Sequence, residues 1–282
     1  MRSDCVALCA VVCGFSLISV ACSSRPTPPA AGSPAFYWTA ALETYNAGDY
    51  VKTAEHLARL TRSANEHTAQ AHPMQLAVLA GLMQAHADLA DQYEYGARSN
   101  KANPTPFRKR VSDYRSMAGQ EALRFGEAYM GFGKAVTGAE VELAFPFPPR
   151  GSMAMASEMS KVAQGLLPAG AEGESAQKVM IQRGVLMAVC QMTGSGKDAP
   201  KAQEMLKTPP LKVARATFVA GLAETLYGAS VLFGERKLNM PDRQEYFLQA
   251  TRAALPAEAT GTAKELKTKI EEDWKKVGKK KG

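Results

Sequence analysis

Hydrophobic positions recur at helical spacing along almost the whole chain after residue 35. Tyr50, Ala54, Leu57 and Leu60 follow one another by steps of four, three and three residues, which place them on one face of a helix. The same periodicity predicts helices over 36–47, 50–60, 74–96, 107–136, 152–167, 175–193, 199–207, 211–234, 241–255 and 259–277. The alternating segment 141–145 is a weak candidate strand. Glycine or proline separates most helices, so the predicted fold class is all-α, built from stacked antiparallel helical hairpins.

The first predicted hairpin resembles a tetratricopeptide repeat. The sequence YNAGDY at 45–50 is followed by Ala54 and Leu57, and Trp38 stands near the aromatic position of the first helix. In that family, small and aromatic residues let two antiparallel helices pack closely across a tight Gly-Asp turn. Ala54 stands one residue later than the usual small position, and no second clean copy follows at a period of about 34 residues. The resemblance covers about 35 residues and implies a tetratricopeptide-like α-solenoid without indicating a ligand.

The segment 211–234 is the most apolar of the predicted helices. From 216 to 234 it carries one charged residue, Glu224, so a membrane span is allowed on length alone. A central carboxylate is costly in lipid, and Ala214, Gly221 and Gly228 recur every seven residues as a smooth face for a close neighbour. We therefore expect a central buried helix with Glu224 as a partly buried acid. Its carboxylate would reach the rim, pair with an arginine or contact a ligand.

The first 22 residues resemble the signal peptide of a bacterial lipoprotein. Arg2 precedes an almost wholly apolar run, 6–20, which is too short to cross about 30 Å of hydrocarbon. The sequence VAC at 20–22 matches the end of the lipobox, although Ser19 stands where leucine is usual. The resemblance implies cleavage after Ala21 and a diacylglycerol on the Cys22 thiol. Because Ser23 follows, it also implies the periplasmic face of the outer membrane. The alternative is an ordinary secreted protein cut near Ala21.

Four parts are expected along the chain. They are a lipoprotein signal peptide at 1–21, a Pro/Ser-rich tether at 22–34, a helical repeat-like domain at 35–257, and a C-terminal helix with a Lys-rich tail at 258–282. The prolines of the tether favour an extended spacer of at most ~35–40 Å. Once the signal is removed and Cys22 is lipidated, the lone remaining cysteine, Cys190, has no internal disulfide partner. Its apolar neighbours predict a buried, inert thiol.

The net charge of +7 is concentrated at the end of the chain. Five of these positive charges come from Lys275, Lys276, Lys279, Lys280 and Lys281, which leaves +2 for the rest. A nucleic-acid-binding domain needs basic residues spread over one face, so nucleic acid is disfavoured as a partner. The chain is 46% apolar, which is enough to bury a hydrophobic core.

Cations crowd the start of the predicted helix 107–136. Within 18 residues, one acid, Asp113, accompanies Arg98, Lys101, Arg108, Lys109, Arg110 and Arg115. Thr105 is the expected N-cap and Pro106 the expected first helical residue. Cations in a first turn oppose the helix dipole, whereas a helix N-terminus beside arginines suits an anion. We expect an anionic partner to contact Arg108, Lys109, Arg110, Tyr114 and Arg115. The alternative is that these cations are solvated or pair with an acidic neighbouring helix.

Signatures of catalysis and metal binding are weak. The sequence GSGK at 194–197 lacks the first glycine and the final Ser/Thr of a phosphate-binding loop, which favours a surface turn. The four histidines, His56, His67, His72 and His86, form no His-x-x-x-His pair of a zinc hydrolase. The cluster Met153, Met155 and Met159 fits core filling better than a copper site. We therefore expect no catalytic residue, no metal and no cofactor.

Together these features favour a non-catalytic, lipid-anchored scaffold or adaptor of the bacterial envelope that binds a protein or small-ligand partner. Two alternatives stay open. The chain would be an accessory ligand-binding lipoprotein of a solute transporter if a closed pocket lay between its helices, whereas an open groove favours the scaffold. It would be an envelope-polymer hydrolase if a cleft paired Glu224 with another acid or a histidine. The oligomeric state is not indicated.

Overall fold

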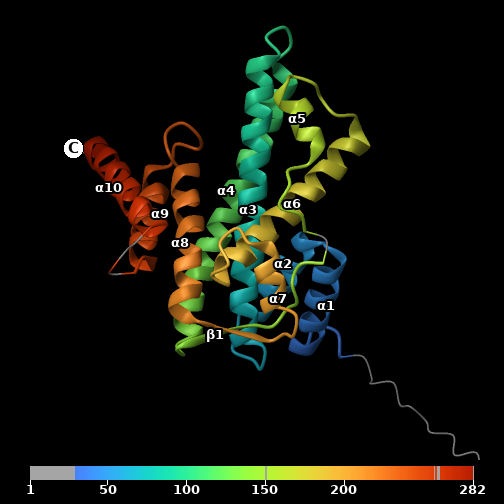
Figure 1. Ribbon diagram of the computed structural model, residues 1–282, viewed down its shortest axis with the longest axis vertical. Coiled ribbons are helices and arrows are strands. Elements are labelled where there is room, and N and C mark those ends of the chain that lie inside the picture. The colour runs from blue at the N-terminus through green and yellow to red at the C-terminus, as the bar shows by residue number, and fades with distance from the viewer. Residues whose placement is uncertain (1–28, 150, 257, 259–260, 282) are drawn as a thin grey trace, which may run out of the picture.

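The computed structural model describes residues 29–149, 151–256, 258 and 261–281 (Figure 1). This part of the chain is mostly helical, as the sequence predicts. Its elements are α1 (Pro34–Ala47), α2 (Tyr50–Leu60), α3 (Thr68–Ser99), α4 (Thr105–Ala135), β1 (Glu140–Leu143), α5 (Ser157–Ala163), α6 (Gly170–Met192), α7 (Ala199–Met205), β2 (Leu211–Ala214), α8 (Arg215–Leu232), α9 (Pro241–Ala254) and α10 (Thr262–Lys281). The predicted signal peptide 1–21, Cys22 and the tether up to residue 28 lie outside the described residues.

The turn between α1 and α2 follows from two adjacent residues. Gly48 ends α1 with a φ of 78°, a left-handed conformation that glycine adopts without steric cost, and its N–H caps the helix by bonding to the carbonyl of Tyr45. Asp49 then begins α2, because its carboxylate accepts a hydrogen bond from the N–H of Lys52 at 3.2 Å. The chain therefore reverses where the sequence places the Gly-Asp turn.

The long helices α3 and α4 form the tall hairpin at the centre of Figure 1. α3 also contacts α2, α5, α6 and α8, so it is covered on most of its sides. It begins at Thr68, before the predicted start at 74, because Pro73 is accommodated inside the helix. The predicted helix 107–136 is α4, which begins two residues earlier, at Thr105.

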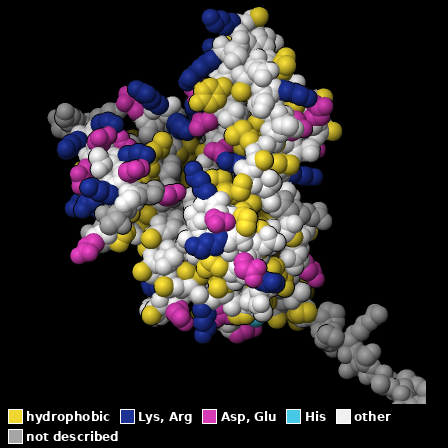
Figure 2. Space-filling model, viewed as in Figure 1, with side chains coloured by type: hydrophobic (Ala, Val, Ile, Leu, Met, Phe, Trp, Pro, Cys, Tyr) yellow, Lys and Arg dark blue, Asp and Glu magenta, His cyan; other side chains and the backbone are white. Residues whose placement is uncertain are grey.

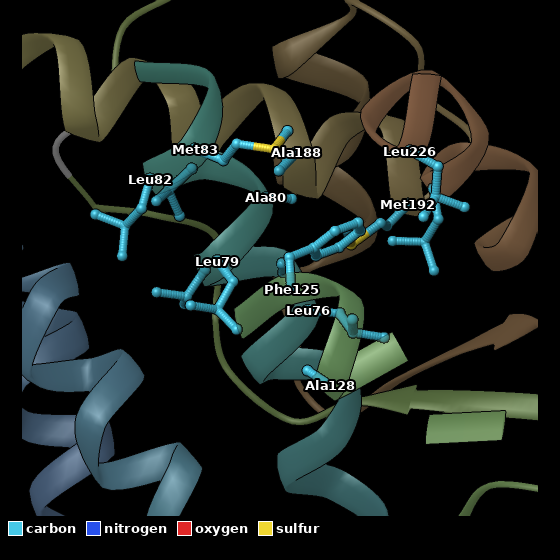
Figure 3. Packing of buried hydrophobic residues seen from close by; sticks show 14 of the residues in the cluster. Leu76, Leu79, Ala80, Leu82, Met83, Phe125, Ala128, Ala188, Met192 and Leu226 are labelled. Carbon is cyan, nitrogen blue, oxygen red and sulfur yellow. The ribbon is translucent and has the colours of Figure 1, made fainter. Parts of the chain in front are cut away.

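The main core lies where α3 meets three other helices, α4, α6 and α8. Figure 3 shows side chains of α3, α4, α6 and α8 pointing toward one another, among them Leu76, Phe125, Met192 and Leu226. Each of these four side chains is fully or almost fully buried. Apolar surface that is removed from water stabilises the folded state by about 25 cal/mol per Å², so these buried side chains contribute strongly to the stability of the fold.

The segment 211–234 is helical only from Arg215 onward, so the prediction of a helix from 211 is wrong for its first four residues. Leu211–Ala214 forms strand β2, which pairs antiparallel with β1 and sets Val141 opposite Val213. Both valines are buried. The strand 140–143 begins one residue before the weak candidate at 141–145 and ends two residues before the end of that candidate. Pairing across 70 residues has no local signature, which is why helical periodicity alone misassigned β2.

The predicted helix 152–167 is also shorter than expected and spans Ser157–Ala163. The rest of the segment 211–234 is α8, which contacts α6 and α9 and buries Phe218, Leu222 and Leu226 on one face, while Glu224 on another face is exposed. Where α8 meets α6, a Cβ on Gly221 would overlap the carbonyl of Gln191, so glycine is required there. In the described part of the chain, no helix combines the length and the apolar character that crossing a membrane requires.

Candidate functional site

Most of the predicted cations line one open groove. It lies between the segment after α8 and the end of the hairpin where α3 is connected to α4, at the top of Figure 1. Its volume is about 960 Å³. Among the described residues its lining includes one acid, Glu94, and five cations: Arg98, Lys101, Arg108, Arg115 and Lys237. In Figure 2, dark blue Lys and Arg side chains gather around the hollow between the tall hairpin and the body to its left. An excess of cations in a concave surface attracts anionic partners.

The start of α4 brings Arg108 to this groove. The helix begins at Thr105, with Pro106 in its first turn and Pro104 at the N-cap, one residue before the predicted cap. No side chain caps these first N–H groups, and the first turn carries no acid. The positive end of the helix dipole therefore adds to the charge of Arg108.

Glu94 organises two of the arginines. Its Oε1 accepts a hydrogen bond from Arg98 Nη2 at 2.6 Å, and its Oε2 accepts one from Arg115 Nη2 at 2.5 Å. The Arg115 side chain is 17% exposed, and its Nε has no hydrogen-bond partner among the described residues. One carboxylate thus offsets about one of the two guanidinium charges. The buried N–H at Arg115 Nε is still able to donate a hydrogen bond.

Lys237 closes the far side of the groove. Its Nζ donates to both carboxylate oxygens of Asp91 on α3, at 2.9 and 3.1 Å, and so ties the segment after α8 to the hairpin. Lys101 and Arg108 form no ion pair with any described residue. These two cations carry most of the uncompensated charge.

Three of the predicted contact residues lie elsewhere. Lys109 and Arg110 are exposed on α4 but do not line the groove. Tyr114 is 5% exposed, and its ring centroid lies 5.5 Å from that of Tyr93 and 6.3 Å from that of His86. Burial raises the pKa of Tyr114, which packs in the smaller hydrophobic cluster under α5. With 3.6 residues per turn, Tyr114 lies on the buried face of α4, although it is close in sequence to the exposed arginines.

Glu224 is exposed rather than partly buried, and its carboxylate reaches the rim, which was one of the expected alternatives, without pairing with an arginine. Its Oε2 accepts a hydrogen bond from Gln191 Nε2 of α6 at 2.7 Å. The close approach of α8 to α6 occurs at Gly221, one turn earlier, and Glu224 lies at the edge of that contact. A neutral amide, rather than a second acid or a histidine, is therefore its partner.

The candidate chemistry outside the groove is sparse. Burial raises the pKa of the Cys190 thiol to about 11, which keeps it protonated and inert at neutral pH. Within the ranges that the structure describes, no three His, Cys, Asp or Glu side chains lie close enough together to hold a metal ion.

Sequence reasoning found four of the groove's five cations because they lie close together along the chain. It missed Glu94 because the predicted helix ended at 96, whereas α3 continues to Ser99 and so places Glu94 and Arg98 four positions apart on one helix, the spacing of a favourable ion pair. It also missed Lys237, which follows Asp91 by 146 positions and carries no local signal.

Comparison with known proteins gives no identity for the chain. Neither a protein family, nor a curated protein, nor a solved structure matches it. The function is therefore inferred from the chemistry of the site itself.

Proposed function

We propose that this chain is a non-catalytic, lipid-anchored adaptor of the bacterial envelope that binds an acidic protein partner in the cationic groove. The observation that carries the proposal is the groove lining, in which five cations face one acid. A cationic concave surface of this kind accelerates encounter with an acidic partner and selects against basic ones.

The shape of the groove favours an adaptor over the two alternatives. The groove is open rather than enclosed between helices, which suits a macromolecular partner better than a small solute held for a transporter. A polymer hydrolase would need a paired acid or a histidine beside Glu224, and Gln191 occupies that position.

The position of the groove supports tethering through the N-terminus. α1 begins at Pro34 in the lower part of Figure 1, and the ends of α3 and α4 that carry the groove lie at the top. With 32 residues, α3 is about 48 Å long. A lipid on Cys22 would therefore hold the groove away from its own membrane, facing the periplasm.

We also propose that α1 to α4 form a tetratricopeptide-like stack. Each of these helices contacts the next in sequence order. In the first hairpin, the rings of Tyr45 and Tyr50 meet edge to face at 5.4 Å, and Ala54 is 6% exposed, as close helix packing requires. A stack of this kind presents grooves between its helices as binding surfaces.

The groove is tested with two charge-reversal variants of equal net charge. Lys101→Glu with Arg108→Glu removes the unpaired cations of the groove, whereas Lys109→Glu with Arg110→Glu reverses exposed cations just outside it. We expect the first pair to weaken binding of fluorescent poly-L-glutamate at least ~10-fold more than the second, because charge-assisted hydrogen bonds contribute about 1.5–3 kcal/mol each. Fluorescence anisotropy measures the affinity.

Measurements at different salt concentrations and on lipid vesicles separate binding in the groove from other kinds of electrostatic binding. Binding should weaken as salt rises through about 0.15 M, where screening acts over about 8 Å. Equal losses in the two double variants would show that net charge alone drives binding and would overturn the groove. Retention of both variants on phosphatidylglycerol vesicles, together with loss of poly-glutamate binding only in the first, distinguishes a protein partner from an anionic lipid.

The anchor is tested separately. Cys22→Ala should move the protein from the membrane fraction to the soluble periplasmic fraction, because the thiol that accepts the lipid is gone. Immunoblotting of fractionated cells measures this. A variant that is processed normally and still sediments with membranes would contradict lipid anchoring at Cys22.

A further inference from the structure

A second cleft, separate from the cationic groove, lies between α2 and the second half of α4. Residues of α3 form its floor, and its volume is about 590 Å³. Sites for small ligands in proteins commonly enclose about 300–1,000 Å³. The cleft shares no lining residue with the cationic groove, so an inference about it stands independently of the proposed function.

The floor of the cleft holds a histidine with a spare hydrogen-bonding atom. His72 is 5% exposed, and its Nδ1 has no hydrogen-bond partner among the described residues. Burial lowers the pKa of His72, which keeps the imidazole neutral, with one donor and one acceptor nitrogen. A buried polar atom without a partner is uncommon in native structures, and because His72 lines the cleft, its Nδ1 is available to a ligand that reaches the floor.

Small and polar residues surround the imidazole in this floor. A Cβ on Gly131 of α4 would come within 3.0 Å of His72 Cε1, so the glycine lets α4 approach the imidazole closely. Gln75, one turn from His72, accepts a hydrogen bond from Thr61 Oγ1 at 2.9 Å through its Oε1 and is 7% exposed. The floor is therefore suited to hydrogen bonds with a polar ligand rather than to an apolar one.

Charged side chains of both signs line the walls of the cleft. The described lining includes three arginines and two glutamates, namely Arg59, Arg62, Arg124, Glu55 and Glu127. Arg59 of α2 and Arg62 of the turn that follows it are exposed and form no ion pair with any described residue. Arg124 donates to Glu121 at 3.2 Å, and the other oxygen of Glu121 has no hydrogen-bond partner among the described residues.

We propose that this cleft binds a short zwitterionic peptide. Its carboxylate would pair with Arg59 and Arg62, since guanidinium groups bind carboxylates through two parallel hydrogen bonds. Its ammonium group would face Glu55 or Glu127, and its backbone amides would bond to the floor. A ligand with only negative charge would leave the two glutamates without a partner. A ligand with only positive charge would be repelled by the three arginines.

The four histidines of the chain supply a direct test. His56 and His72 line the cleft, whereas His67 stacks on Trp38 and His86 lies in the core, both outside it. The full chain, labelled with ¹⁵N-histidine, is titrated with tri-L-alanine and followed by NMR. We expect saturable shifts for His56 and His72 and none for His67 and His86. Probes with an acetylated N-terminus or an amidated C-terminus should bind more weakly, because each lacks one charge.

A matched pair of variants checks the role of the arginines. Arg59→Gln with Arg62→Gln should weaken tri-L-alanine at least ~10-fold, since two charge-assisted hydrogen bonds are lost. Lys109→Gln with Lys134→Gln removes the same charge from exposed positions outside both sites and should leave affinity unchanged. An unaltered amide spectrum in each variant excludes misfolding. Absence of a saturable His72 shift at millimolar peptide, or equal binding by the blocked probes, would overturn the proposal.

Discussion

Gly81 and Gly184 face each other where α3 crosses α6. A Cβ on Gly184 would overlap the carbonyl oxygen of Gly81, and a Cβ on Gly81 would overlap the backbone of Val185. We predict that Gly184→Ala lowers the free energy of unfolding by about 1–3 kcal/mol, because one helix must move to accept the methyl group. Urea unfolding followed by circular dichroism measures the change.

The control for this prediction is Gly133→Ala in α4. Gly133 is exposed, and a Cβ there meets no atom within 4 Å. Alanine should therefore leave stability unchanged or raise it by up to about 1 kcal/mol through its higher helix propensity. A Gly184→Ala protein as stable as wild type would mean that α3 and α6 do not cross at these glycines.

His86 makes stability depend on pH. Burial lowers its pKa from the ordinary 6.5 to about 4, so between these pH values the unfolded chain binds a proton that the folded chain does not. The free energy of unfolding should therefore fall as the pH falls from about 6.5 to about 4, by on the order of 3 kcal/mol in total. Urea unfolding at several pH values measures this loss.

His86→Phe isolates the contribution of that histidine. The phenyl ring keeps an aromatic contact with Tyr114 and removes Nδ1, which has no hydrogen-bond partner among the described residues. We expect a flatter profile between pH 6.5 and 4. Partly buried acids such as Asp88, whose pKa is raised by desolvation, contribute with the opposite sign, and their contributions cancel when the two profiles are subtracted. Identical profiles would contradict a neutral, buried His86.

At the scale of elements, the helices were predictable because each carries its own signal. Apolar periodicity located α2, and the caps at Gly48 and Asp49 fixed where α1 ends and α2 begins. Strand β2 was not predictable, because its four residues are stabilised by pairing with β1 about 70 positions earlier. The start of α3 was placed too late, because the helix continues through Pro73 back to Thr68, and a proline inside a helix is a feature that local rules disfavour.

The candidate site was predictable to the extent that its residues are neighbours in sequence. Arg98, Lys101, Arg108 and Arg115 were found as a cluster of charge, whereas Lys237 reaches the groove only through tertiary folding. The sequence alone does not give the exposure of each side chain, so the buried Tyr114 was included in the contact surface and the exposed Glu224 was expected to be partly buried. Side-chain orientation on a helix needs the packing partner, not just the period.

At the scale of the whole molecule, the C-terminal helix is attached to the rest of the described structure mainly through its neighbours at that end of the chain. In Figure 1, α10 lies at the left edge, and its contacts are mainly with α9 and, to a smaller extent, α8. Its buried apolar side chains include Leu266, Ile270 and Val277. A hydrogen bond from Tyr227 Oη to Asp273 Oδ2 at 2.9 Å adds to this attachment. Helices with few buried contacts open at lower free energy than the core.

The two tryptophans of the chain report on opposite ends of it. Trp38 lies in α1 and stacks on His67, whereas Trp274 lies in α10 and packs against the core cluster. We predict that in single-tryptophan variants, Trp274→Phe and Trp38→Phe, the fluorescence of Trp274 changes at a lower urea concentration than that of Trp38. The reason is that α10 detaches before the helices around α3 lose their shared core.

Far-ultraviolet circular dichroism of the same two variants is the control for this comparison. It should follow the Trp38 transition, because most of the helical residues lie in the body around α3, and its midpoint should agree between the variants if neither phenylalanine alters that body. Ile270→Asp, which charges a buried contact of α10, should widen the gap by lowering the Trp274 midpoint alone. Coincident tryptophan transitions would instead show that α10 is part of one cooperative unit with the rest of the described chain.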